Sequence, residues 1–127
     1  METMARLGMP AIVVISNDAA WGMIRLEEKY KMPNEVAELG HTSTELFDKN
    51  DNKGKIRAYE KMAAMWDGYG ELVSEPEKIL PAIKQAAVNG KPSIINVEVD
   101  REALSSWTQP HADRAAESKK ATLPYKD

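Results

Sequence analysis

The chain has 127 residues, of which 43% are hydrophobic and 29% charged, and its formal net charge is −3. This length and composition are those of one ordinary globular domain at most. The mild charge gives no indication of a nucleic-acid-binding surface, and the absence of cysteine excludes disulfides and thiolate metal sites. No apolar run is long enough to span a bilayer. We therefore expect a cytoplasmic protein without nucleic-acid or membrane partners.

The first half of the chain predicts a helix, a buried strand and a second helix. Residues 1–7 are mainly helix formers and end at Gly8. Residues 11–16 form a β-branched run without alternation, which is typical of a parallel strand covered on both faces. Residues 21–31 follow a helical pattern. The stretch 32–55 is irregular, and its proline, glycines and charges indicate an excursion over the surface.

The second half predicts two further helices and two further strands. A helix is expected where apolar residues recur at helical spacing and a glycine follows: Ile56, Tyr59, Met62, Ala63, Trp66 and Gly68. Residues 71–73 could form a short strand. Ser74 and Glu77 have capping-box spacing for a helix over 75–89, and residues 93–99 form another buried strand. This order predicts an α/β fold, a partial parallel-sheet sandwich with helices on both faces and the two long strands parallel.

The first strand ends at a pair of polar residues, Asn17 and Asp18, and two small residues follow, Ala19 and Ala20. In open α/β sheets, ligands bind beyond the carboxyl ends of the strands. One interpretation is that Asn17 or Asp18 caps the next helix. A cap needs only one such residue, however, and the alanines allow another group to approach the backbone. Mg²⁺ also fits, because it takes carboxylate oxygens and completes its shell with water and phosphates.

A longer run, ETMARLGMPAIVVISNDAAWGMI (residues 2–24), resembles the second half of the thiamin diphosphate motif. That motif occurs in acetolactate synthase-like, benzoylformate decarboxylase-like and 2-hydroxyacyl-CoA lyase-like enzymes. Residues 59–100 resemble the end of the same domain, where a helix, a Gly-x-Gly/Ala-Glu turn, a Glu-Pro helix and a Gly-Lys-Pro strand follow in order. The ordered combination is more specific than the short motif alone. It implies that residues 1–100 are the C-terminal part of a thiamin-diphosphate-binding domain.

The resemblance also implies roles for individual residues. Asp18 matches the position whose side-chain oxygen binds the Mg²⁺ that bridges the cofactor's diphosphate, and Ala20 matches a position whose main-chain carbonyl is often a further ligand. Asn17 matches a mainly structural position beside the cofactor. The segment that lines the diphosphate and the thiazolium side corresponds to Trp21, Gly22 and Met23. A shift of one residue would make Asn17 the ligand, at the loss of the Gly-Met match.

The chain departs from this family in lacking the Gly-Asp-Gly half of the motif. The glutamate that contacts the cofactor's aminopyrimidine, usually from a neighbouring subunit, also has no counterpart, so no catalytic residue is implied. We therefore expect one piece of a larger enzyme, a homodimer or homotetramer, and expect the isolated piece to be inactive and prone to aggregate. The resemblance implies a carbon–carbon lyase or synthase that depends on thiamin diphosphate and Mg²⁺. Its substrate would be a 2-oxo acid, a 2-hydroxyacyl compound or an acyl-CoA.

The alternative is a non-catalytic α/β interaction module or regulatory subunit that keeps the scaffold without the site. The missing Gly-Asp-Gly favours it, and a Gly-Asp-Gly encoded upstream of Met1 would favour the enzyme instead.

The other residues considered for a functional site carry weaker signals. His41 and His111 lie in irregular stretches without a second ligand at metal spacing. Met62 and Met65 are expected in the core. Residues 101–127 are polar and strand-free, and the resemblance implies a tail or a lid over the active site.

Overall fold

The structure is a computed structural model that describes residues 1–46 and 55–103. The chain divides into two units, one formed by Met1–Asp18 and Ile56–Val99 and the other by Ala19–Lys55 and Asp100–Asp127. The predicted tail or lid, apart from its first residues, lies outside the described residues, as does His111. In the described part of the chain, no helix combines the length and the apolar character that crossing a membrane would require.

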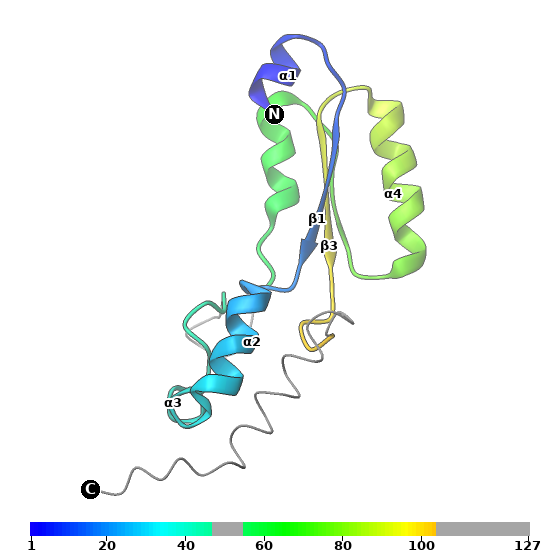
Figure 1. The fold of residues 1–127 in the computed structure, drawn as a ribbon. Coiled ribbons are helices and arrows are strands. Elements are labelled where there is room, and N and C mark those ends of the chain that lie inside the picture. The colour runs from blue at the N-terminus through cyan, green and yellow to red at the C-terminus, as the bar shows by residue number, and fades with distance from the viewer. Residues whose placement is uncertain (47–54, 104–127) are drawn as a thin grey trace, which may run out of the picture. The chain divides into compact units, whose positions relative to one another are not determined.

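The first unit contains a sheet of three parallel strands in the order β1-β3-β2 (Figure 1). Their bounds are Ile12–Asn17 for β1, Gly70–Val73 for β2 and Ser93–Glu98 for β3. In the β1–β3 register, Ile12 lies opposite Ser93 and Asn17 lies opposite Glu98. The predicted parallel pairing of the two long strands is therefore confirmed, and the short strand predicted over 71–73 is β2.

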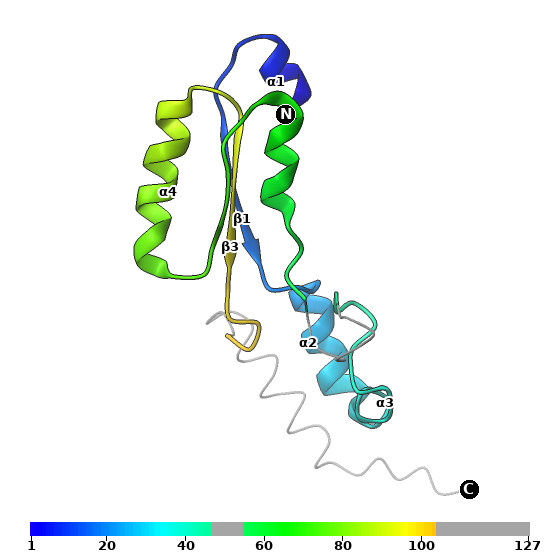
Figure 2. The same ribbon diagram turned by 180° about the vertical axis from the view of Figure 1, so that it is seen from behind.

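Helices cover both faces of this sheet. Helix α4 (Pro76–Asn89) lies on one side and the 3-10 helix η1 (Tyr59–Trp66) on the other, as Figures 1 and 2 show from opposite directions, and α1 (Glu2–Arg6) precedes β1. The buried core between α4 and the sheet consists of Val73, Ala82, Ala86 and Ile95. The predicted fold class, a parallel sheet with helices on both faces, is confirmed.

Two glycines allow backbone segments to approach each other closely. A Cβ atom on Gly70 would lie 2.0 Å from the carbonyl oxygen of Glu60, so η1 packs directly on the main chain of β2. A Cβ atom on Gly68 would lie 1.9 Å from the carbonyl oxygen of Pro92. Gly68 does not end the helix as predicted, because Asp67 adopts the left-handed conformation there, with φ 54°.

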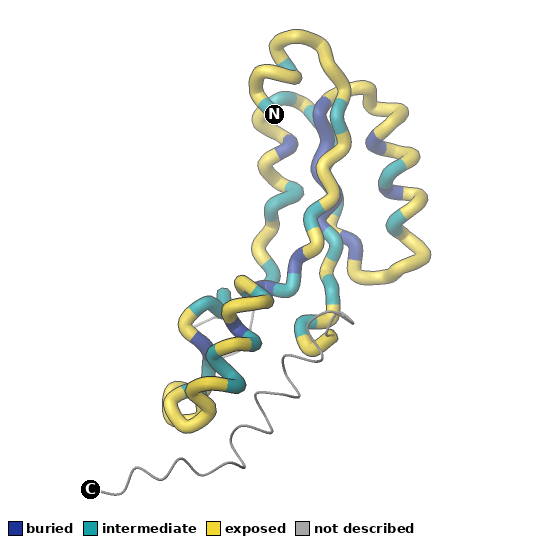
Figure 3. The backbone as a smooth tube through the Cα atoms, in the orientation of Figure 1, coloured by how far each residue is buried: buried dark blue, intermediate teal, exposed yellow. Residues whose placement is uncertain are grey.

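The two long strands differ in burial (Figure 3). The first four residues of β3 are buried, as predicted. In β1, however, Ile12, Val13 and Val14 are exposed by 37%, 38% and 49%. The prediction that β1 is covered on both faces is therefore wrong for this chain. The reason is its position, because β1 lies at the edge of the sheet, whereas α4 and η1 pack mainly on β2 and β3.

Two smaller predictions in this unit are also wrong. Helix α4 has no side-chain cap, and the Ser74 hydroxyl instead donates to Glu98 at 2.8 Å, so there is no capping box. Met62 and Met65 are 48% and 78% exposed and do not belong to the core, since the face of η1 that packs on the sheet carries Ala63.

The second unit contains α2 (Gly22–Lys31) and α3 (Pro33–Leu39). Helix α2 was predicted, but the prediction of an irregular surface excursion over 32–55 is wrong for α3. Pro33 stands in its first turn and Gly40 ends it with φ 79°. Proline at the start of a helix and glycine just past its end are normal helix boundary residues. The sequence prediction instead assigned both residues to a loop.

Candidate functional site

Asn17 is the last residue of β1 and is buried. Its side-chain amide donates to the Asn96 Oδ1 atom at 3.0 Å and to the Arg57 carbonyl oxygen at 3.2 Å. Its main-chain carbonyl accepts a hydrogen bond from the Val99 N–H at 3.1 Å. These contacts tie the end of β1 to the central strand and to the segment before η1.

Asn96 completes this buried polar cluster. It is fully buried in the middle of β3, and its amide donates to the Arg57 carbonyl at 2.7 Å and to the Glu60 carboxylate at 2.8 Å. Sequence reasoning missed this residue. The available signal was a single amide between the apolar residues Ile95 and Val97, since a buried amide requires hydrogen-bond partners.

The chain then turns sharply at Ala19. Asp18 is partly buried and ends the first unit, while Ala19 begins the second and is 2% exposed. Ala19 has φ 56°, in the left-handed region that costs a residue other than glycine about 1–2 kcal/mol. Such outliers concentrate at functional sites, where surrounding contacts hold them.

The strain at Ala19 predicts opposite effects for two substitutions. Ala19→Gly should leave the free energy of unfolding unchanged or raise it by up to about 1 kcal/mol, because glycine adopts positive φ without strain. Ala19→Val should lower it by about 2 kcal/mol or more, because a β-branched side chain is both strained and overpacked there. Urea unfolding measures both changes. In the control, Ala87→Gly on the exposed face of α4 should cost about 1 kcal/mol. A similar loss of stability for Ala19→Gly would contradict the inference that the backbone at Ala19 is strained.

Ala20 lies in a short antiparallel contact with a loop of the same unit. It forms an isolated bridge with Glu45. Two hydrogen bonds frame this bridge: Trp21 N–H to the Thr44 carbonyl at 3.4 Å and Leu46 N–H to the Ala19 carbonyl at 2.8 Å. In this pattern, the residue between the two bonded ones directs its own N–H and C=O to the opposite side. The Ala20 carbonyl therefore points away from the loop.

Helix α2 begins directly after this contact. Its N-cap residue is Trp21, whose side chain makes no capping hydrogen bond, and its first turn holds no acidic residue. The N-cap residue of this helix is therefore neither Asn17 nor Asp18, which corrects that interpretation. Trp21 and Met23 are each 73% exposed. The N-terminal N–H groups of a helix carry partial positive charge and favour anions, phosphate groups included.

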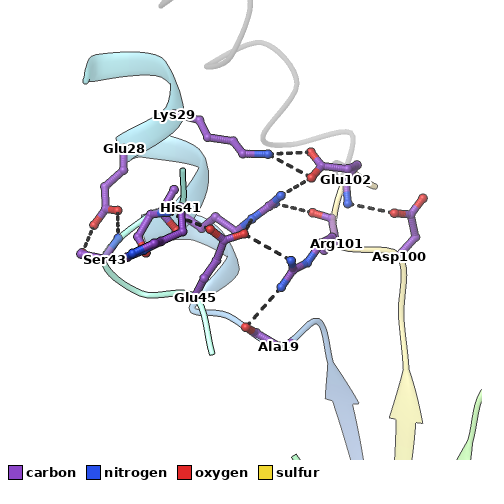
Figure 4. Close-up of polar contacts among 11 residues, drawn as sticks. Ala19, Glu28, Lys29, His41, Ser43, Glu45, Asp100, Arg101 and Glu102 are labelled. Carbon is purple, nitrogen blue, oxygen red and sulfur yellow. Dashed lines mark hydrogen bonds and ion pairs between the residues drawn. The ribbon is translucent and has the colours of Figure 1, made fainter. Parts of the chain in front are cut away.

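An ionic network that the sequence did not predict includes Lys29, Glu45, Arg101 and Glu102 (Figure 4). Arg25 pairs with both carboxylates of this network. Arg25 is 1% exposed, and its guanidinium donates to Glu45 at 3.1 Å, to the Arg101 carbonyl at 2.7 Å and to the Glu102 carboxylate. Glu45 also accepts from the Thr42 N–H at 2.7 Å and pairs with Arg101 at 3.3 Å. Lys29 pairs with Glu102 at 3.0 Å.

The network lowers the pKa of both carboxylates. Burial raises the pKa of Glu45, but hydrogen bonds from the Thr42 N–H and Arg25, with the charges of Arg25 and Arg101, outweigh burial and hold it below its usual range. Burial likewise raises the pKa of Glu102, and hydrogen bonds and charges from Lys29 and Arg25 bring it below its usual range. Both groups are therefore ionised at neutral pH.

This region offers oxygen donors of the kind that bind a hard cation such as Mg²⁺, when a bound phosphate group and water supply the cation's other ligands. Within the described residues, no group of three or more His, Cys, Asp or Glu could hold a metal ion. The His41 ring lies 2.8 Å from the Thr42 carbonyl. Mg²⁺ does not need a side-chain cage, since one or two carboxylates, water and phosphate oxygens suffice. A carboxylate at Asp18 and a main-chain carbonyl at Ala20 are oxygen donors of the kind that Mg²⁺ prefers.

Comparison with known proteins identifies the family. Residues 1–97 match the family model described as "Thiamine pyrophosphate enzyme, C-terminal TPP binding domain". The chain is 29% identical over 104 residues to a probable acetolactate synthase of Mycobacterium bovis and to the acetolactate synthase large subunit IlvG of Mycobacterium tuberculosis. Each alignment covers 78% of this chain but 16% of the relative, so the chain spans about one sixth of the relatives' length. No solved structure matches it. The chain therefore belongs to the thiamine pyrophosphate (thiamin diphosphate) enzymes, in the family of their C-terminal TPP-binding domain.

Proposed function

We propose that this chain orients the diphosphate and Mg²⁺ of thiamin diphosphate in an enzyme that cleaves or joins carbon–carbon bonds. When bound, the cofactor supplies the chemistry for breaking a bond beside a carbonyl group. Family membership and the acetolactate synthase relatives support this proposal. The substrate would be a 2-oxo acid, a 2-hydroxyacyl compound or an acyl-CoA. Since the relatives are much longer, the proposal includes a larger enzyme that acts as a homodimer or homotetramer.

Asp18 has the central role in this proposal. It follows a parallel strand at its carboxyl end, where α/β sheets bind ligands, and it precedes the strained turn at Ala19. The Asp18 carboxylate and the Ala20 carbonyl would be ligands of Mg²⁺. Asn17, whose amide is hydrogen-bonded within the sheet, would hold the strand end in place.

The start of α2 would contact the anionic end of the cofactor. The main-chain N–H groups of Gly22 and Met23 belong to the N-terminus of a helix whose N-cap residue makes no side-chain capping bond and whose first turn holds no acidic residue, which favours a diphosphate. The exposed side chains of Trp21 and Met23 would line the cofactor on its apolar side.

Asp18→Ala tests the proposal in the complete protein. The dissociation constant of thiamin diphosphate in the presence of Mg²⁺ should rise by about 100-fold, because even second-shell changes at metal sites cost about 10–100-fold. Binding without Mg²⁺ should not change. Isothermal titration calorimetry measures both affinities. Glu35→Ala removes an exposed carboxylate from α3 and is the matched control, expected to leave the affinity unaltered.

The possible outcomes separate the two functions under consideration. Equal affinity of Asp18→Ala and wild type in the presence of Mg²⁺ would remove Asp18 from the metal site. If the wild-type protein itself bound no thiamin diphosphate, the enzyme function would be wrong, and a non-catalytic interaction module would take its place.

A further inference from the structure

The main chain at Ala19 is held by donors from two other segments of its own unit, and Figure 4 shows the contact with Arg101. The Ala19 carbonyl accepts a hydrogen bond from the Leu46 N–H at 2.8 Å and another from the Arg101 Nη2 atom at 3.3 Å. Leu46 belongs to the loop that bridges Ala20, and Arg101 belongs to the segment that follows β3. A turn with unfavourable φ needs such contacts, since alanine by itself does not favour this conformation.

Arg101 is itself held in place by Glu45. The Arg101 Nη1 atom lies 3.3 Å from Glu45 Oε1, and the Glu45 side chain is only 10% exposed. The same carboxylate accepts hydrogen bonds from Arg25 at 3.1 Å and from the Thr42 N–H at 2.7 Å. Glu45 thus joins three segments, namely helix α2, the loop at Thr42 and the segment with Arg101.

The shape of the guanidinium group is essential to this arrangement. Its planar fork presents one nitrogen to the Glu45 carboxylate while another reaches the Ala19 carbonyl. A lysine ammonium is a single point of charge and could not reproduce both contacts in this geometry. An exposed ion pair contributes little to the stability of a fold. This network differs from such a pair, because Arg25 is buried and also paired with Glu45.

We propose that Arg101, held by Glu45, is a positioning residue that fixes the turn at Ala19 and so directs the Ala20 carbonyl toward Mg²⁺. This inference rests on the proposed function, in which that carbonyl is a ligand. Neither Arg101 nor Glu45 needs to contact the cofactor. Their effect is on the affinity for the metal and diphosphate, because Mg²⁺ demands near-ideal octahedral geometry and a misdirected carbonyl weakens the site.

Arg101→Gln in the complete protein tests this role. The half-saturating concentration of Mg²⁺ for thiamin diphosphate binding, measured by calorimetry, should rise by about 10-fold. Affinity for thiamin diphosphate without Mg²⁺ should stay the same, and turnover at saturating cofactor and metal should stay within about twofold. Arg101→Lys should restore only part of the Mg²⁺ affinity. Hydrogen exchange of the peptide that contains Ala19 and Trp21 should be faster in both variants.

Glu102→Gln is the matched control. Glu102 pairs with Arg25 and Lys29 at the outer side of the same network and is 59% exposed. This substitution should leave the Mg²⁺ requirement and the exchange at Ala19 near wild-type values. Equal losses of Mg²⁺ affinity in Glu102→Gln and Arg101→Gln would reduce Arg101 to a general structural role and overturn the inference, as would unchanged Mg²⁺ affinity in Arg101→Gln.

The failure of the inference can be told apart from the failure of the proposed function. If the wild-type protein bound no thiamin diphosphate with Mg²⁺, the proposed function would be wrong, and the assignment of a metal role to this turn would be wrong with it. Hydrogen exchange would still show whether Arg101 holds Ala19. Unchanged exchange in Arg101→Gln would contradict the positioning role whether or not the cofactor binds.

Discussion

Replacing Arg25 with methionine should lower the free energy of unfolding by about 3–5 kcal/mol, the usual cost of removing one partner of a buried ion pair. Methionine has a similar length and is a good helix former, so α2 itself should be little affected. The loss arises because Glu45, which is 10% exposed, would keep its charge with one donor fewer. The Arg101 carbonyl would lose a donor as well. Urea unfolding followed by far-UV circular dichroism measures the change.

Two further variants show whether burial is the cause. Arg6→Met removes an exposed arginine, whose pair with Glu2 spans 3.5 Å, and should change stability by no more than about 0.5 kcal/mol. Arg25→Lys keeps the charge but not the fork and should have an intermediate effect. If Arg25→Met lowered the free energy of unfolding no more than Arg6→Met, the network would contribute nothing measurable to stability. Such a result would also contradict its part in positioning Arg101.

The cost of Arg25→Met should depend on pH. The pKa values of Glu45 and Glu102 are lowered in the folded protein, and Arg25 contributes to both shifts. A carboxylate with a lowered folded-state pKa stabilises the fold above its unfolded pKa, and that contribution is lost as the pH falls through the folded-state pKa. The difference between wild type and Arg25→Met should therefore shrink in acid.

The fold could be predicted from sequence where a segment's own pattern decides its structure. The apolar run of β3 and the long amphipathic pattern of α4 are examples. Helix α3 was missed because Pro33 and Gly40 were assigned to a loop, although each is also a normal helix boundary residue. The exposure of β1 could not be predicted, because β1 carries the same kind of apolar run as β3 and differs from it in lying at the edge of the sheet.

Part of the candidate site could likewise be predicted from the sequence, and part could not. The place of Asn17 and Asp18 at a strand end follows from local pattern and a general rule of α/β sheets. The left-handed conformation of Ala19 could not be predicted, since alanine rarely adopts it. The partners of Arg25 lie 20 and 77 positions away in the sequence, at Glu45 and Glu102. Only the folded chain brings them together.

Asn96 is the second residue from which we expect a large effect. It is fully buried, and its side chain makes three hydrogen bonds, accepting from Asn17 and donating to the Arg57 carbonyl and to Glu60. A buried polar group that loses its partner costs about 1–3 kcal/mol, whereas one satisfied hydrogen bond contributes less. Removing Asn96 therefore affects stability mainly through the groups left behind.

Asn96→Leu should lower the free energy of unfolding by about 2–4 kcal/mol, because the Asn17 amide loses an acceptor and the Glu60 carboxylate a donor. Leucine has the same branched arrangement of side-chain heavy atoms and is larger than asparagine, so a cavity does not account for this loss. Gln85→Leu, which removes an exposed amide from α4, should change stability by no more than about 0.5 kcal/mol.

A double-mutant cycle of Asn96→Leu with Asn17→Ala isolates the contact between the two amides. Because the two side chains share one hydrogen bond, the double variant should lose less than the sum of the single losses, by about 0.5–3 kcal/mol. Strictly additive losses in urea unfolding would mean that the two amides act independently and that Asn96 does not hold the end of β1.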